Sequence, residues 1–162
     1  MTYKFERRLM LFVDGTNFQT QLIKKLGYKF DPKKNPPVSI YSFSRLLIQS
    51  FLKKIGFKDK QIQPIFIRNF WFASYKGIDG NKEKYDEIYR SLRDSEFEPY
   101  IFSREKNDKE KGVDITLTKE LLVNAFNQNF EVGVLVTGDK DYLELVKEVK
   151  KIRRSNFWNV FQ

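Results

Sequence analysis

Two short apolar runs in this chain each lead directly to an acidic residue. Residues 9–13 are followed at once by Asp14, and residues 132–136 are followed within three residues by Asp139. An amphipathic helical pattern comes after each acid. Continuous apolar runs of this length are typical of strands that are buried on both faces of a parallel sheet. The sequence therefore predicts an α/β domain whose strands deliver carboxylates to one edge of the sheet, where they would bind a divalent metal ion.

The remaining segments continue this alternation of strands and helices. Further strands are expected at residues 63–73 and 97–102, and a short one at residues 157–161. The spacing of apolar residues predicts helices at residues 17–26, 40–55, 82–95, 113–127 and 140–152. The alternation predicts a three-layer α/β sandwich. Its parallel sheet would have four to five strands, in the order 3-2-1-4 by position in the chain, with helices on both faces.

A chain of 162 residues is expected to form one domain, residues 1–162. About residues 27–39 form a basic loop insertion that contains Pro32, Pro36 and Pro37, and prolines at this density argue against regular structure. Residues 153–162 form an atypical tail with a weak turn pattern. Neither segment is long enough to be a second domain.

The chain contains no cysteine and no histidine. Zinc sites of thiolate or imidazole are therefore excluded, as are Ser-His-Asp and Cys-His catalysis. A metal in this protein must be held by oxygen ligands, which favours Mg²⁺ or Mn²⁺. The absence of cysteine fits a reducing compartment, and the apolar run before Asp14 is too short for a signal peptide. We therefore expect a cytoplasmic location and no membrane partner.

The expected strand order explains why the acids should meet. Ligands of open parallel sheets bind at the carboxyl edge, where the strand order reverses. The first and fourth strands are neighbours there, so Asp14 and Asp139 should face each other, and Asp114 can join them from the first turn of its helix. Carboxylates this close repel unless a cation lies between them. The alternative is structural, because Asp114, Asp139 and Asp141 also suit helix N-termini and Asp14 suits a turn.

Positive charge is concentrated in the first part of the chain. Residues 1–60 hold 13 Lys and Arg against 4 Asp and Glu, whereas residues 61–162 hold 17 of each. Such a one-sided excess suggests a polyanionic partner. A solvated basic surface without a partner is the alternative.

Three segments resemble the signature segments of the NYN domains. They are FVDGTNF at residues 12–18, KGVDITL at residues 111–117 and VTGDKDY at residues 136–142. The resemblance spans about residues 9–152 and is greatest to the LabA-like (DUF88) branch, within the wider PIN-like nuclease fold. It implies a single NYN or PIN-like domain and a metal-dependent ribonuclease, with an endoribonuclease as the expected type.

The resemblance also implies roles for individual residues. By position, Asp14, Asp114 and Asp139 are the metal ligands, and Mg²⁺ or Mn²⁺ is the cofactor. The catalytic set is wider and adds Asp141 and Asn17, of which Asn17 matches the family asparagine that supports the first acid.

Other positions depart from the family pattern or extend it. Many relatives carry a further Asp six residues after the helix Asp, whereas this chain has Glu120 there, with the same charge on a longer side chain. Thr16 and Thr137 are additional candidates for contact with a phosphate or a water molecule.

The expected substrate and partner is RNA, single-stranded or structured. Cations in or near the proline loop and around the second strand would contact phosphates without sequence preference: Lys24, Lys25, Lys29, Lys33, Lys34, Arg68 and Lys76. Trp71, Phe72 and Tyr75 lie at the end of the second strand and would stack on unpaired bases. Packing in the core is the alternative for these aromatic residues.

Two functions remain open on the sequence. One is the ribonuclease, and the other is a non-catalytic RNA-binding or regulatory module that keeps the same fold. The oligomeric state is open as well, with a homodimer among the alternatives.

Overall fold

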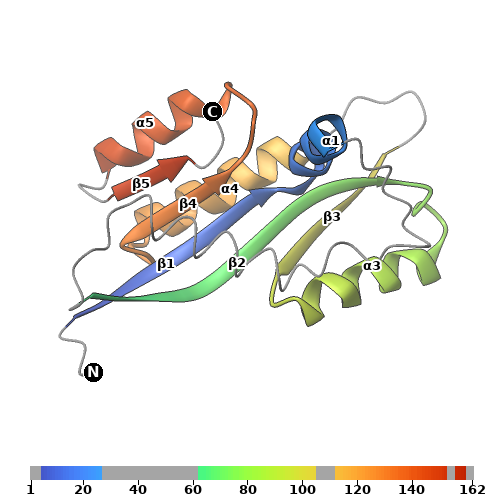
Figure 1. The fold of residues 1–162 in the computed structure, drawn as a ribbon, viewed down its shortest axis with the longest axis horizontal. Coiled ribbons are helices and arrows are strands. Elements are labelled where there is room, and N and C mark those ends of the chain that lie inside the picture. Colours follow the sequence, from blue (N-terminus) through green and yellow to red (C-terminus); the bar gives the residue numbers. More distant parts are fainter. Residues whose placement is uncertain (1–4, 27–61, 105–111, 153–155, 160–162) are drawn as a thin grey trace.

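The computed structural model describes residues 5–26, 62–104, 112–152 and 156–159 (Figure 1). The predicted loop at residues 27–39 and the predicted helix at residues 40–55 lie outside this part of the chain. In chain order the elements are β1 (Phe5–Asp14), α1 (Gly15–Leu26), β2 (Ile62–Lys76), α3 (Lys82–Asp94), β3 (Glu98–Arg104), α4 (Val113–Phe126), β4 (Val132–Val136), α5 (Tyr142–Ile152) and β5 (Asn156–Asn159).

The strands form one parallel sheet in the order β3-β2-β1-β4-β5. β1 is central and pairs with β2 on one side and with β4 on the other. This confirms the predicted order 3-2-1-4, and the expected short last strand is present as β5 beside β4. The arrowheads of β1 and β4 point to the same end of the sheet (Figure 1), so the residues that follow these strands meet at one edge.

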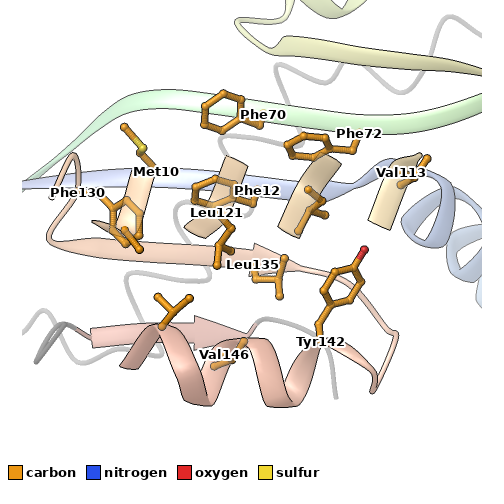
Figure 2. Packing of buried hydrophobic residues seen from close by; sticks show 13 residues of the cluster. Met10, Phe12, Phe70, Phe72, Val113, Leu121, Phe130, Leu135, Tyr142 and Val146 are labelled. Carbon is orange, nitrogen blue, oxygen red and sulfur yellow. The ribbon is translucent and has the colours of Figure 1, made fainter. Parts of the chain in front are cut away.

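Each face of the sheet has its own apolar core. On one face, Phe12 and Phe70 pack with residues of α4 and α5 (Figure 2). On the other face, Val13 and Trp71 pack with Leu92 of α3 and with side chains of α1. Successive strand residues point to opposite faces, which is why one run of apolar residues serves both cores. Helices therefore cover both faces and make the predicted three layers.

The long strands extend beyond their apolar runs. β1 begins at Phe5 and pairs there with Ile62 of β2, although Arg8 is exposed. Backbone groups make these ladders, so polar residues can extend a strand whose apolar part was predicted more narrowly. β2 continues past the end of β1, and its residues 74–76 pair with residues 102–104 of β3. A two-stranded extension therefore projects beyond Asp14 at the carboxyl edge.

Candidate functional site

Asp14 ends β1 and also caps α1. Its Oδ1 accepts the backbone N–H of Asn17 at 2.9 Å, which satisfies one of the donors left without a partner at a helix N-terminus. The residue is only 4% exposed. The cap explains why α1 begins at Gly15, two residues before its predicted start. Asp14 therefore has a structural role as the cap of α1, whereas the structural alternative expected from the sequence was a turn. Its Oδ2 faces a different neighbour.

Thr137 is that neighbour, and it connects Asp14 with Asp139. Its hydroxyl donates to Oδ2 of Asp14 at 3.2 Å and accepts the backbone N–H of Asp139 at 3.1 Å. Thr137 is buried, so the two bonds form away from bulk water, where such bonds are strong. Asp139 Oδ1 in turn accepts the backbone N–H of Asp141 at 2.9 Å, in a turn that leads into α5.

Asn17 ties the start of α1 to the loop after β4. Its Oδ1 accepts the backbone N–H of Gly138 at 2.8 Å. A Cβ atom at Gly138 would lie 2.9 Å from the same oxygen, so a glycine lets the loop approach this closely. Asn17 thus joins the two segments that carry Asp14 and Asp139, and its own backbone N–H binds Asp14.

The head of α1 is also packed against β2. Thr16 Oγ1 accepts the backbone N–H of Ser74 at 2.9 Å, so the Thr16 hydroxyl serves the fold. Gly15 lies against the indole of Trp71, where an added Cβ would be 2.3 Å from ring atoms. These contacts fix the position of Asp14, which directly precedes them.

Asp114 lies in the first turn of α4 and is exposed. The N-cap position of this helix is Gly112, with a left-handed backbone (φ 101°), so Asp114 is not the cap. Tyr142, the first residue of α5, donates its hydroxyl to Oδ1 of Asp114 at 2.7 Å. This bond connects the two helices that cover the same face of the sheet.

The three predicted ligand residues, Asp14, Asp114 and Asp139, all raise the pKa of the Tyr142 hydroxyl. Burial raises the pKa of Tyr142 well above its ordinary value of 10.0. The hydrogen bond to Asp114 and the negative charges of Asp14, Asp114 and Asp139 raise this pKa further. The three carboxylates come from the end of β1, from α4 and from the loop after β4. They therefore lie within electrostatic range of one point at the carboxyl edge.

Asp141 and Glu120 are placed differently. Asp141 is exposed, and it donates its backbone N–H to the carboxylate of Asp139. Glu120 hydrogen-bonds to Tyr100 and acts electrostatically on Arg68. Glu120, at the position where many relatives have an Asp, thus lies near β2 and β3 in this chain. It is farther along α4 than Asp114.

The three aspartates offer ligand atoms of the type that a hard divalent cation prefers. Three aspartates offer only oxygen, which Mg²⁺ and Mn²⁺ prefer, and a cation would relieve their repulsion. Within the described ranges, however, no three acidic or other ligating side chains stand close enough together to hold an ion. The carboxylates share a neighbourhood without a formed coordination shell, so binding one ion together requires their side chains to rotate.

The predicted RNA-binding cations have different surroundings. Lys24 on α1 and Lys76 at the end of β2 are exposed. The Arg68 guanidinium forms two hydrogen bonds with Glu98, one of them from Nε to Oε1 at 2.7 Å, and lies 4.5 Å from the centre of the Phe70 ring. For the others the structure gives less: Lys25 is placed only by its backbone in α1, and Lys29, Lys33 and Lys34 lie outside the described residues.

The aromatic residues at the end of β2 serve mainly the core. Trp71 is 2% exposed and Phe72 is fully buried. The Trp71 indole packs edge-on against Phe97 at 5.4 Å between ring centres, and its Nε1 donates to Oη of the half-buried Tyr75 at 3.3 Å. Core packing therefore describes Trp71 and Phe72 in this structure. Phe72 lies in the core on the α4 and α5 face, and a base could stack on Trp71 only if the head of α1 moved.

Sequence reasoning did not single out Tyr142 as a partner of Asp114, nor Thr137 as the link between Asp14 and Asp139. Both residues lie in the segment 136–142 that carries the family resemblance. A tyrosine directly after the Gly-Asp-x-Asp acids was a usable indication, because its hydroxyl can donate to a nearby carboxylate.

The parallel sheet in the order β3-β2-β1-β4-β5, with helices on both faces, defines an α/β fold of the PIN-like class. The model of the NYN domain matches residues 8–158, and the chain belongs to this family. The match confirms the family that the three sequence segments indicated. Membership of the LabA-like branch stays a prediction.

A solved structure of a protein of unknown function from Vibrio parahaemolyticus has the same fold. It is 16% identical, with a TM-score of 0.61, and the likeness covers 98% of this chain and 83% of that chain. At this identity the likeness shows the fold alone. No curated protein matches the chain. Over the described ranges, no helix combines the length and the apolar character needed to cross a membrane.

Proposed function

We propose that this domain is a ribonuclease that hydrolyses RNA phosphodiester bonds with Mg²⁺ or Mn²⁺. One observation carries the proposal: the Thr137 hydroxyl joins Asp14, at the end of β1, to Asp139, in the loop after β4, at the carboxyl edge of the sheet. Acids that gather at the carboxyl edge of a parallel sheet favour a cation and a phosphate ligand there. Membership of the NYN family adds a nuclease-type fold.

In this proposal Asp14 and Asp139 are direct ligands of the ion, and Asp114 is a third, direct or through water. A bound divalent cation supplies Lewis acidity, which activates water and offsets the charge that grows on the phosphate. Thr137 and Asn17 hold the two segments that carry Asp14 and Asp139 in a fixed relation.

The remaining roles concern the substrate. Asp141 is exposed beside Asp139 and completes the catalytic set. Lys24 and Lys76, both exposed, would bind the RNA backbone without sequence preference. Arg68 is not included among these contacts, because Glu98 already neutralises its charge.

The test is cleavage of a labelled single-stranded RNA with Mn²⁺, Mg²⁺ or EDTA. We expect cutting by the parent only with metal, and a loss of at least about 100-fold in Asp139→Asn, the scale on which charge-stabilising groups act. Asp94→Asn at the exposed end of α3 is the matched control and should cut like the parent. A circular RNA separates the two modes, because an endonuclease cuts it and an exonuclease does not. Equal cutting by Asp139→Asn would contradict the proposal.

A second candidate is a non-catalytic RNA-binding module with the same fold. One observation favours it: in the described part of the chain no group of acids is arranged to hold a metal ion. Asp14 and Asp139 also have capping and turn contacts that need no metal. RNA that is retained on a filter by the parent but stays uncut with each metal would select this module over the nuclease.

A further inference from the structure

Two tyrosines lie side by side on the outer surface of α3. Tyr85 is 37% exposed and Tyr89 is 39% exposed. Their rings are nearly parallel, with an interplanar angle of 19° and 6.2 Å between the ring centres. α3 contributes Ile88 and Leu92 to the apolar core on its face of the sheet, and neither tyrosine belongs to that cluster. The two rings therefore form an aromatic surface that faces water.

A cation lies at each end of this pair. Lys82 is three residues before Tyr85, and Arg93 is four residues after Tyr89. Side chains at these spacings are neighbours along a helix, so the four residues form one line, the tyrosine stripe. Both cations are exposed, and among the described residues neither forms an ion pair. Their charges are therefore available to an anionic ligand.

Most acids of α3 lie on other sides of the helix. α3 contains four cations and four acids, so its total charge is zero. At about 100° per residue, however, Glu83, Glu87 and Asp94 lie away from the tyrosine stripe. Asp86 is closer, and Arg90 lies beside it, with Nε donating to the backbone oxygen of Asp86 at 3.1 Å. The side of α3 that carries the tyrosine stripe is therefore the positive one.

The tyrosine stripe starts near the edge of the sheet that carries the aspartates. α3 follows a short turn after the end of β2 (Figure 1). Lys84 Nζ donates to the backbone oxygen of Lys76 at 2.7 Å, which joins the start of α3 to the end of β2. Lys76 is four residues beyond Phe72, the residue that pairs with Asp14. A strand of nucleic acid at the carboxyl edge can thus pass Lys76 and continue along α3.

Exposed aromatic rings between cations suit single-stranded nucleic acid. Proteins that bind single strands contact the backbone with cations and stack successive bases on aromatic side chains. Bases within a duplex stack on one another, whereas unpaired bases have a face free for an aromatic ring. The tyrosine stripe has both components, in an order that alternates with neither an acid nor an apolar residue.

We propose that the tyrosine stripe binds single-stranded RNA outside the aspartate site, with bases stacked on Tyr85 and Tyr89 and phosphates at Lys82 and Arg93. The inference rests on the proposed function and specifies unpaired RNA as its substrate class. Binding along α3 would hold a substrate strand after it leaves the carboxyl edge.

The experiment is fluorescence anisotropy of a labelled oligouridylate titrated with the full chain in EDTA, so that no metal-dependent cutting occurs. We expect Tyr85→Ala and Tyr89→Ala each to bind about 10-fold more weakly than the parent, the scale of one lost base stack. Tyr85→Phe and Tyr89→Phe keep the rings and should bind like the parent. Lys82→Ala and Arg93→Ala should reduce the salt slope by about 0.7 for each lost phosphate contact, whereas the tyrosine variants should leave the slope unchanged.

Matched controls lie on the opposite face of the sheet. Phe126→Ala removes a ring that is 63% exposed on α4, and Lys150→Ala removes an exposed cation of α5. Both should bind RNA like the parent. Two further probes separate stacking from damage to the fold. Inorganic polyphosphate has charges but no bases, and an RNA duplex has no unpaired base, so the tyrosine variants should bind each of them like the parent.

The outcomes separate the inference from the proposed function. Unchanged affinity for oligouridylate in both Tyr85→Ala and Tyr89→Ala overturns the inference, as does an equal loss in Phe126→Ala. An equal loss with polyphosphate or with the duplex also overturns it, and so does a parent that binds no RNA. If the parent binds RNA through the tyrosine stripe but cuts none with metal, the inference holds and the proposed nuclease fails.

Discussion

The hydroxyl of Thr137 donates to Oδ2 of Asp14 at 3.2 Å, although 123 positions separate the two residues in the chain. The same hydroxyl accepts the backbone N–H of Asp139. One oxygen atom thus connects the end of β1 with the loop that follows β4. The separation of two proposed ligands depends on a residue that is itself neither acidic nor exposed.

Thr137→Val keeps the shape of this side chain and removes the link. The part-buried N–H of Asp139 then loses its acceptor, and the loss of a hydrogen bond of this kind costs about 0.5–1.5 kcal/mol of unfolding free energy. Urea denaturation measures this change. Thr137→Ser, which keeps the hydroxyl, should lose much less. Equal stability of Thr137→Val and the parent would show that the link contributes nothing.

Asn17 offers a local test of the second connection. Asn17→Ala removes the acceptor of the Gly138 N–H, so we expect the amide of Gly138 to exchange its hydrogen faster, while Asn17→Asp keeps an acceptor and should protect it. Hydrogen exchange followed by NMR resolves this single amide. The prediction is wrong if the amide exchanges at one rate in all three proteins.

The contact of Gly15 with Trp71 predicts a strong effect of one methyl group. A Cβ atom at Gly15 would lie 2.3 Å from the indole, and overpacking of a core typically costs about 1–3 kcal/mol or more. We expect Gly15→Ala to unfold at lower urea, with an altered near-ultraviolet circular dichroism signal of tryptophan.

Two matched variants test the cause of this loss. Gly80 has a positive φ but nothing within 4 Å of its added Cβ, so Gly80→Ala measures backbone strain without a clash. A smaller ring in the Trp71→Phe background should tolerate Gly15→Ala better than the parent does. Equal costs of Gly15→Ala in both backgrounds would exclude the indole as the reason.

The sequence predicted the arrangement of the backbone better than it predicted the contacts of the side chains. The apolar runs before Asp14 and Asp139 predicted neighbouring strands, and the strand order placed both acids at one edge. Strand ends were predicted less well, because Phe5 and Lys76 extend their ladders through backbone hydrogen bonds that do not depend on apolar side chains.

Side-chain partners were not predictable in the same way. The bond between Tyr142 and Asp114 depends on how α5 is rotated against α4, which the spacing of apolar residues does not specify. Trp71 follows the same principle: an aromatic residue at the end of a strand suits a base or a core equally well, and only the close approach of Gly15 decides for the core. The ligand roles of the acids stay predictions.

Tyr75 predicts how stability responds to alkaline pH. Burial raises its pKa above the ordinary 10.0, against the opposing effect of the hydrogen bond from Trp71. The unfolded chain then releases this proton at a lower pH than the folded protein does. The stabilising contribution is therefore complete below about pH 10 and is lost as the pH rises towards the folded pKa.

We expect the unfolding free energy of Tyr75→Phe to decrease less steeply above about pH 10 than that of the parent. Urea denaturation at a series of pH values measures the slope. Tyr89→Phe, which changes a side chain 39% exposed on α3, controls for the loss of a tyrosine elsewhere. Parallel curves for Tyr75→Phe and the parent would contradict the prediction.

The cations make distinct predictions for RNA binding. Lys24→Ala and Lys76→Ala should each weaken binding to all sequences alike and reduce the salt slope by about 0.7 for each phosphate of a single strand that the variant no longer neutralises. Arg68→Ala should leave RNA binding unchanged, because its guanidinium is bound by Glu98. Filter binding at several salt concentrations tests all three. A larger decrease in affinity for Arg68→Ala than for Lys76→Ala would show that Arg68 exchanges Glu98 for RNA.

The cap that Asp14 provides for α1 has an evolutionary consequence. Asparagine caps helices about as well as aspartate, and its amide nitrogen could donate to Thr137 where the carboxylate now accepts. In the proposed nuclease, a change of one base in the codon would therefore remove an anionic ligand while the helix start and the strand end keep their places. Under that proposal, descendants of the domain can lose turnover in one step and persist as folded proteins that keep the proposed RNA-binding surface.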